Sequence, residues 1–180
     1  MQKVRDGEIN KLAVLFERHH RALFNYFVRM TGDKALSEDL VQDVFFRVLK
    51  YRHTYQPGTL FAPWMYQIAR NAQADSFQKR KVEMTPLDDE ERPGLELASK
   101  EADPAESFRR REDVRLLRRA LARLSPEKRE VLILSRFQDL KYEQIGEILA
   151  CDAGAVKVRV FRALKSLGQI FFELSGEKAS

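Results

Sequence analysis

Apolar side chains recur every three or four residues through much of the chain, which is the spacing of amphipathic helices. In the first half the pattern predicts a helix over roughly residues 8–30 that ends at Gly32. A second helix is expected to begin at Ser37, a residue type that suits the N-cap, and to carry an apolar stripe over residues 40–49. A third helix follows, with its apolar face over residues 61–72.

The second half has the same helical character. Its spacing predicts a helix over residues 109–124, another opened by Ser125 and Pro126, a short one over 142–149 and a last one over about 155–174. No segment alternates between apolar and polar positions with a period of two, so no sheet is expected. The fold class predicted from these patterns is all-α.

Charge divides the chain into three parts. Residues 1–81 carry 14 basic and 8 acidic side chains, a net charge of +6, and residues 109–180 carry 16 and 10, again +6. Between them, residues 82–108 carry 2 and 9, a net charge of −7, with three prolines and few apolar residues. This composition is typical of a flexible acidic linker, although an ordinary solvated loop has it too. We therefore expect two small helical domains, over residues 1–81 and 109–180, joined by this linker.

Overall composition narrows the class of function. The 180 residues have a net charge of +5 and a pI near 9.4, which favours a polyanionic partner such as nucleic acid. Cys151 is the only cysteine, so a disulfide framework is excluded and a cytoplasmic location is expected. No apolar run is long enough to span a membrane, and the three histidines lack the companions of a metal site. Neither a metal nor a cofactor is predicted.

A helix-turn-helix pattern marks the end of the chain. The helix over 142–149 is followed by a turn over 151–154 that contains a glycine, and then by a basic helix. Between residues 155 and 170 this last helix has no acidic residue and four cations, which are Lys157, Arg159, Arg162 and Lys165. Such a helix fits the major groove of DNA, where Arg bonds guanine edges and Lys or Arg meets phosphates. The alternative is a basic surface helix of a helical bundle.

One polar edge is expected on the second helix. Asp39, Gln42 and Asp43 are three and four residues apart, so their side chains share one side of that helix. They are therefore candidates for binding a partner with basic and polar groups.

The third helix combines aromatics, amides and cations. These lie over residues 61–71, and a basic cluster over 79–81 follows. Aromatic faces stack bases, amides bond base edges and cations hold phosphates, so the segment favours single-stranded DNA. Trp64 fits a core position equally well. Tyr55 and Tyr66 are expected on a loop and on a polar face, where a base would reach them.

With these motifs the chain resembles the extracytoplasmic-function (group IV) sigma factors of bacterial RNA polymerase. Residues 39–45 are similar to the helix with which that family grips the clamp of the polymerase β′ subunit, and residues 61–71 to the part that melts the −10 element. Residues 140–163 are similar to the helix-turn-helix of the family that reads the −35 element. The resemblance covers essentially the whole chain, and it implies a σ2 domain over 1–81 and a σ4 domain over 109–180.

The resemblance, with the chemistry above, assigns residues to each partner. Contacts to the β′ clamp helices of core polymerase are implied for Asp39, Gln42, Asp43 and Phe45. Contacts to the −10 element, including its single-stranded non-template strand, are expected from Tyr55, Trp64, Tyr66, Arg70, Asn71, Lys79, Arg80 and Lys81. Contacts to the −35 duplex are expected from Lys157, Arg159, Phe161, Arg162 and Lys165. The resemblance also implies the β flap and an anti-sigma factor as partners.

Two other classes of function stay open. A stand-alone DNA-binding regulator would account for the second half but would leave the polar edge and the aromatic segment of the first half unused. An enzyme has no support, because the sequence contains no phosphate-binding glycine loop and no Ser-His-Asp or Cys-His arrangement at a supporting spacing. The sequence therefore predicts a promoter-specificity subunit of RNA polymerase that does not itself catalyse a reaction.

Overall fold

The computed structural model describes the backbone of residues 1–83 and 104–176, and the side chains of residues 1–79 and 111–176. Helices are the only regular elements in these residues, which confirms the predicted all-α class. Of the acidic segment 82–108 that was expected to be a linker, residues 84–103 lie outside the described residues. Residues 82–83 belong to the end of α4 (Phe61–Glu83) and residues 104–108 to the start of α5 (Pro104–Arg123), so the helix predicted from residue 109 begins at residue 104.

Six helical segments make up the first half. They are α1 (Gln2–Arg5), η1 (Ile9–Lys11), α2 (Leu12–Thr31), α3 (Lys34–Lys50), η2 (Arg52–Thr54) and α4 (Phe61–Glu83), where η denotes a 3₁₀ turn. The first predicted helix therefore divides into η1 and α2. It ends, as predicted, at a left-handed Gly32, whose φ is 74°.

The predicted start of α3 was wrong. Asp33, not Ser37, is the N-cap, and its Oδ1 accepts a hydrogen bond from the backbone N–H of Leu36 at 3.0 Å. Ser37 lies one turn inside the helix and is fully buried, and its hydroxyl donates to the carbonyl of Asp33. Because α2 ends at Thr31, the next residue able to cap α3 is Asp33, and the helix starts there.

Four helices make up the described second half. They are α5 (Pro104–Arg123), α6 (Pro126–Phe137), α7 (Tyr142–Leu149) and α8 (Ala153–Gly176). Pro126 occupies the first turn of α6, and α7 has the predicted bounds. The turn before α8 differs from the prediction. Its left-handed residue is Ala150, with a φ of 51°, while Gly154 lies inside α8.

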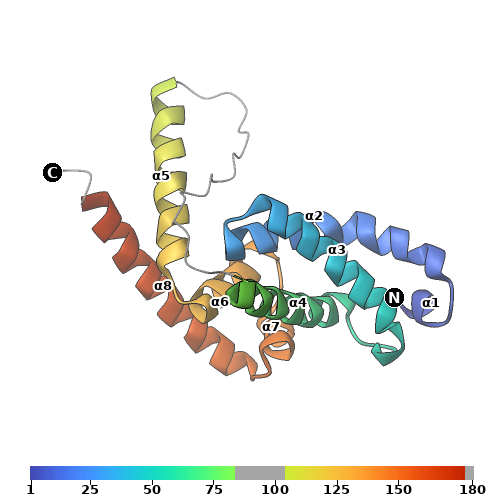
Figure 1. Cartoon of the computed structure of the whole chain (residues 1–180). Coiled ribbons are helices and arrows are strands. Elements are labelled where there is room, and N and C mark those ends of the chain that lie inside the picture. The colour runs from blue at the N-terminus through green and yellow to red at the C-terminus, as the bar shows by residue number, and fades with distance from the viewer. Residues whose placement is uncertain (84–103, 177–180) are drawn as a thin grey trace.

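The two halves share one hydrophobic core. Its largest cluster joins Tyr26, Phe27 and Met65 of the first half to Leu132 and Ile145 of the second. Figure 1 shows α6 and α7 in the centre, between the α2–α3–α4 group and the long α5 and α8. A smaller cluster, made by Leu116, Ala120 and Leu174, holds α5 against α8. The fold is therefore two helical groups that are packed directly against each other.

Candidate nucleic-acid interface

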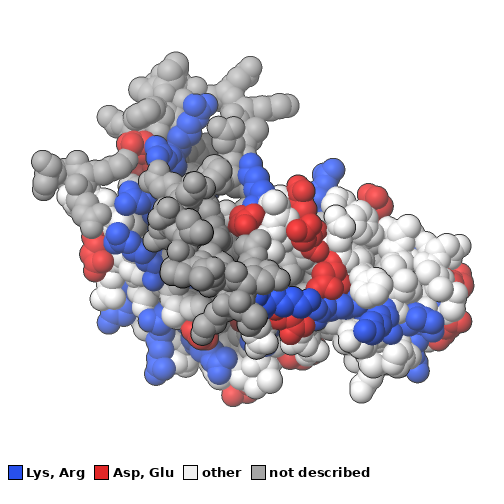
Figure 2. Space-filling view, viewed as in Figure 1, with Lys and Arg blue, Asp and Glu red and all other residues white. Residues whose placement is uncertain are grey.

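Helix α8 has a buried side and a cationic side. Val156, Val160 and Ala163 are buried, because they recur every three or four residues and face α6 and α7. The four predicted cations of this helix and Phe161 are all exposed: Lys157, Arg159, Phe161, Arg162 and Lys165. In Figure 2, Lys and Arg side chains gather along the lower left of the molecule, where α8 runs. This helix can therefore meet phosphates and base edges without disturbing its own packing.

The turn before α8 sets the direction of that helix relative to α7. The backbone N–H of Cys151 donates to the carbonyl of Gly146 at 3.0 Å and closes the end of α7. Asp152 then caps α8, because its Oδ1 accepts from the N–H of Ala155 at 2.9 Å. Two hydrogen bonds on consecutive residues thus fix the angle between α7 and α8.

The polar edge of α3 is present in the structure. Asp39 and Gln42 are exposed, whereas Asp43 is half-buried and pairs with Arg47 at 3.0 Å. Arg47 also bonds Asp75 of α4 at 2.7 Å, so Asp43 belongs to a network that ties α3 to α4. Two of the three predicted polar residues are therefore free of ion pairs among the described side chains.

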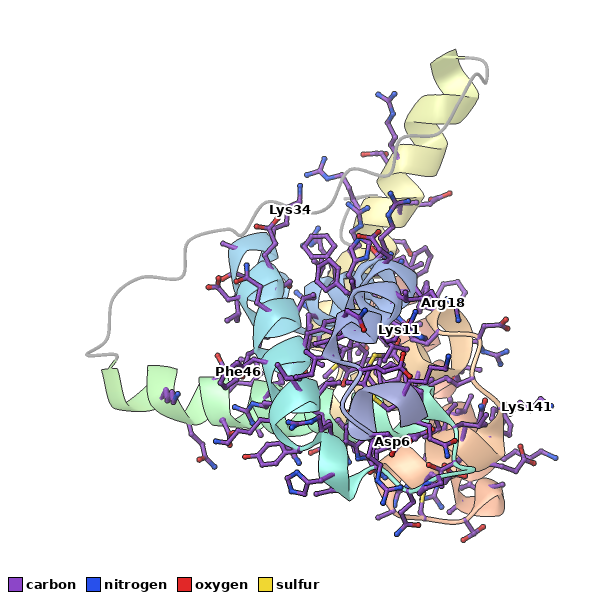
Figure 3. The ribbon with its side chains drawn as sticks, turned by 90° about the vertical axis from the view of Figure 1, so that its right-hand side faces the viewer. Asp6, Lys11, Arg18, Lys34, Phe46 and Lys141 are labelled. Carbon is purple, nitrogen blue, oxygen red and sulfur yellow. The ribbon has the colours of Figure 1, made fainter. Side chains whose placement is uncertain are left out.

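The aromatic on this edge is not the predicted one. Phe45 is only 6% exposed and packs edge-to-face against Phe16, with ring centroids 5.0 Å apart. Phe46 is 65% exposed and lies on the outer side of α3 in Figure 3. Since Phe46 is seven residues after Asp39 and three after Asp43, it continues the same helical edge. The i, i+3, i+4, i+7 spacing would have identified it from the sequence.

Tyr55 and Trp64 line the entrance to α4. Tyr55 is buried rather than open to a base, because its hydroxyl donates to the carbonyl of Thr59 and its ring packs edge-to-face on Trp64 at 5.3 Å. Trp64 is half-buried and borders an open, largely polar groove. The residues lining it are Thr54, Gln56, Thr59, Pro63, Trp64, Gln67 and Glu147. Tyr55 therefore shapes the loop beside this groove, while Trp64 is one of the residues that line it.

Tyr66 and Arg70 are turned toward the second half of the chain. Tyr66 is 3% exposed, contrary to the expected polar face, and its hydroxyl donates to Oε1 of Gln138 at 2.6 Å. Burial holds the pKa of Tyr66 well above its ordinary value. Arg70 bonds Glu130 and the carbonyl of Ile148, each at 2.8 Å. Both side chains are thus engaged within the protein.

The remaining predicted contacts of α4 point outward or lie outside the described side chains. Asn71 and Lys79 are exposed. The side chains of Arg80 and Lys81 belong to the part that the structure does not describe. Among the described residues, no helix is long and apolar enough to cross a membrane, and no group of His, Cys, Asp or Glu could hold a metal ion.

Two family models match the chain. The sigma-70 region 2 model matches residues 15–82, and the sigma-70 region 4 model matches residues 115–167. RNA polymerase sigma factor CarQ of Myxococcus xanthus is 33% identical over 180 residues, which is 99% of both chains. The ECF RNA polymerase sigma factor SigM of Bacillus subtilis is 29% identical over 157 residues, or 87% of this chain and 93% of that protein.

Solved structures show the same fold. CnrH in complex with the cytosolic domain of CnrY matches with a TM-score of 0.70 at 20% identity, over 96% of this chain and 94% of that one. The sigma factor RpoE in complex with the anti-sigma factor NepR from Bartonella quintana matches with a TM-score of 0.67 at 23% identity, over 92% and 96%. With both sigma-70 regions present in order, the chain belongs to the extracytoplasmic-function sigma factors, which bind core RNA polymerase, recognise the −35 and −10 promoter elements and start transcription.

Proposed function

We propose that the two halves divide the work of promoter recognition. Residues 1–81 form the σ2 domain, which binds core polymerase and opens the −10 element, and residues 109–180 form the σ4 domain, which reads the −35 element. The observation that carries this proposal is the two-sided character of α8. Its apolar side is packed inside the protein while four cations face outward, as a helix in the major groove requires.

The polymerase contact is assigned to the outer edge of α3. Asp39 and Gln42 are exposed there, and Phe46 supplies an apolar surface beside them. An exposed aromatic flanked by hydrogen-bonding groups is typical of protein interfaces. Phe45 and Asp43 support this edge from within, through packing and through the pair with Arg47.

The −10 contact is assigned to the outer side of α4 and to the groove beside Trp64. The groove carries hydroxyl and amide groups from Thr54, Gln56, Thr59 and Gln67, which can bond the edge of an unstacked base. Asn71 and Lys79 extend this polar side along α4, and Lys79 can hold a phosphate.

Regulation by an anti-sigma factor in the cytoplasm is the third part of the proposal. RpoE and CnrH, which share the fold, were solved in complexes, RpoE with an anti-sigma factor and CnrH with the cytosolic domain of CnrY. We assign this chain the same kind of partner, and a role as a binding subunit without catalysis of its own.

Reconstitution of transcription tests the proposal. The purified chain is added to core polymerase and a library of genomic fragments from the source organism, and transcript starts are mapped. The chain should co-elute with core polymerase, and the starts should share two sequence elements at a fixed spacing. A stand-alone regulator would instead bind duplex DNA specifically without core polymerase and would produce no new starts, which would refute the proposal.

A further inference from the structure

Helix α5 carries a row of arginines on its outer side. Arg111, Arg115, Arg119 and Arg123 recur every four residues, and all of them are exposed. Residues four apart lie one above the other on a helix surface and are about 6 Å apart along its axis, so this arginine row extends over roughly 18 Å. In Figures 1 and 3 the N-terminal part of α5 extends beyond the other helices. The row is therefore a line of positive charge that a partner can reach.

The arginine row is not neutralised by the described side chains. None of its guanidinium groups forms an ion pair or a side-chain hydrogen bond with another described residue. The exposed acid of this part of α5, Asp113, is two residues from Arg111 and from Arg115, and residues at that spacing do not face each other. Like charges four residues apart destabilise a helix, so the row acts against the stability of α5. An anionic ligand explains its presence better than the fold does.

The charge next to the row is also positive. Arg118 is three residues after Arg115 and is half-buried beside the row. Burial, and then the charge of Arg118, hold the pKa of Arg29 in α2 below its ordinary value. Arg29 donates to the carbonyl of Asn25 at 2.9 Å and lies over the ring of Phe137, so it too is without a carboxylate partner among the described residues. The border between α2 and α5 thus adds to the positive potential of the row.

The exposed side of α5 lacks the features of a protein-binding surface. Between residues 111 and 123 no large apolar side chain is exposed, and Ala122 is the only exposed apolar residue. Protein interfaces have an apolar core in which aromatic residues are enriched. Evenly spaced cations without such a core suit a polymer whose negative charges are also evenly spaced, which is a nucleic-acid backbone.

The row belongs to a different surface from the cations of α8. Leu116 and Ala120 of α5 pack against Leu174 of α8. Leu174 is nine residues after Lys165, which is about two and a half helical turns, so α5 covers the side of α8 that is opposite to Lys165. A DNA duplex that lies on the cations of α8 is therefore separated from the row by α8 itself. The row needs a second polyanion.

We propose that the arginine row of α5 binds the phosphate backbone of single-stranded RNA, namely the transcript that the polymerase makes once this chain has started transcription. RNA is the second nucleic acid of the reaction, since promoter DNA is recognised first and RNA appears when transcription starts. The row contains no aromatic side chain on which a base could stack, so the contact is made to phosphates and does not depend on the RNA sequence.

Affinity for single-stranded RNA tests the contact. The probe is a short fluorescein-labelled oligouridylate, and the protein is the full chain. The row variant replaces the whole row by glutamine, which keeps a good helix former at each exposed position: Arg111→Gln, Arg115→Gln, Arg119→Gln and Arg123→Gln. The control makes the same change of charge at exposed cations of the first half: Lys3→Gln, Lys11→Gln, Arg18→Gln and Arg21→Gln. Circular dichroism verifies that both variants fold.

The row variant should bind the oligouridylate at least tenfold more weakly than the parent, and the control less than twofold more weakly. The slope of log affinity against log salt should also fall by about 0.7 for each phosphate contact that the row supplies. Equal losses in the two variants would mean that only net charge matters, and would overturn the proposal. Unchanged binding by the row variant would assign the row to a protein partner, and would overturn it as well.

Binding to duplex DNA distinguishes RNA from promoter DNA as the occupant. Holoenzyme that contains the row variant should bind a −35 duplex as tightly as the parent holoenzyme does, because the cations of α8 are unchanged. A loss on the duplex as large as the loss on RNA would make the row part of the promoter-binding surface, and RNA would be the wrong occupant.

Cross-linking in transcribing complexes tests the contact where it should occur. Complexes of the holoenzyme are halted at successive transcript lengths with photoreactive thiouridine in the RNA, and the cross-linked peptides of this chain are identified by mass spectrometry. Cross-links should fall on α5, and their yield should drop at least fivefold in the row variant but not in the control. Absence of cross-links to α5 at every transcript length would refute the proposal.

Discussion

Gly146 of α7 and the carbonyl of Cys151 approach so closely that a Cβ on Gly146 would lie 2.5 Å from that oxygen. The neighbour is backbone, and the N–H of Cys151 is itself bonded to the carbonyl of Gly146, so neither side can yield easily. The close approach sets the separation of α7 from the turn and hence the direction in which α8 leaves it.

Replacing Gly146 by alanine should therefore destabilise the helix-turn-helix. We expect Gly146→Ala to lower the free energy of unfolding by about 1–3 kcal/mol, the usual cost of overpacking. The matched control is Gly168→Ala in α8, where an added Cβ meets no atom within 4 Å and should stabilise the helix by roughly 0.5–1 kcal/mol. Urea unfolding followed by circular dichroism measures both, and equal effects would refute the steric explanation.

Removing the exposed polar groups of α3 should weaken polymerase binding without unfolding the protein. Hydrogen bonds to charged groups contribute about 1.5–3 kcal/mol each, so Asp39→Ala with Gln42→Ala should cost at least about 3 kcal/mol in binding to core polymerase. The neighbouring exposed carboxylate provides the control, Glu38→Ala, which should bind as the parent does. Competition against labelled parent for core polymerase measures the loss. Unchanged binding of the double variant would remove the polymerase contact from this edge.

Two cations of α8 should behave differently on DNA. Arg162→Ala should cost about 1–3 kcal/mol in binding to a −35 site and relax specificity at one base pair, as loss of a base contact does. Lys165→Ala should weaken binding to all sequences alike. It should also reduce the salt dependence of the binding constant by about the amount that one phosphate contact contributes. Binding of the holoenzyme to a set of single-base variants, at several salt concentrations, separates the two. Exchanged behaviour would mean that α8 lies on DNA in another register.

Substitutions at Asn71 and Tyr55 should distinguish a role in DNA opening from a role in the structure of the loop. Asn71 is exposed, so Asn71→Ala should leave the fold intact and reduce the formation of open complexes on duplex promoters. A template that is already mismatched at −10 should largely rescue this defect, because opening a duplex costs about 1.4 kcal/mol per base-pair step and that cost is then removed. Tyr55→Phe removes the bond to Thr59 and should be poorly rescued, because it alters the loop itself. Permanganate footprinting reports both, and equal defects of Asn71→Ala on the two templates would exclude a role in opening.

The buried hydroxyl of Tyr26 should make stability sensitive to alkaline pH. Burial, and then the charge of Glu130, raise the pKa of Tyr26 well above its ordinary value of 10.0. The folded chain therefore keeps this proton while the unfolded chain loses it, so the stability present below pH 10 falls as the pH rises above it. Tyr26→Phe should reduce this decline by up to about 1.4 kcal/mol per pH unit. The exposed tyrosine serves as control in Tyr51→Phe, and an undiminished decline in Tyr26→Phe would refute the linkage.

The helices and their inward faces could be predicted from the sequence because the 3.6-residue period is a local property. The bounds of α7, the end of α2 at Gly32 and the buried face of α8 follow from spacing and from residue types alone. The exposure of the α8 cations, and of Asp39 and Gln42 on α3, could be predicted in the same way, because each of these residues lies opposite an apolar stripe. The resemblance to sigma factors rests on these local motifs as well.

Only the tertiary structure decided which polar and aromatic side chains are exposed and free to bind a partner. Tyr66 and Arg70 lie on a helix whose pattern leaves them outside, yet they bond Gln138 and Glu130, which are 72 and 60 residues further along the chain. Tyr55 was expected on an open loop, yet it is buried because its ring packs against Trp64 of α4. Periodicity determines which side of a helix is apolar. The exposure of any residue at the edge of that side is set by the element that packs against it, which local spacing does not contain.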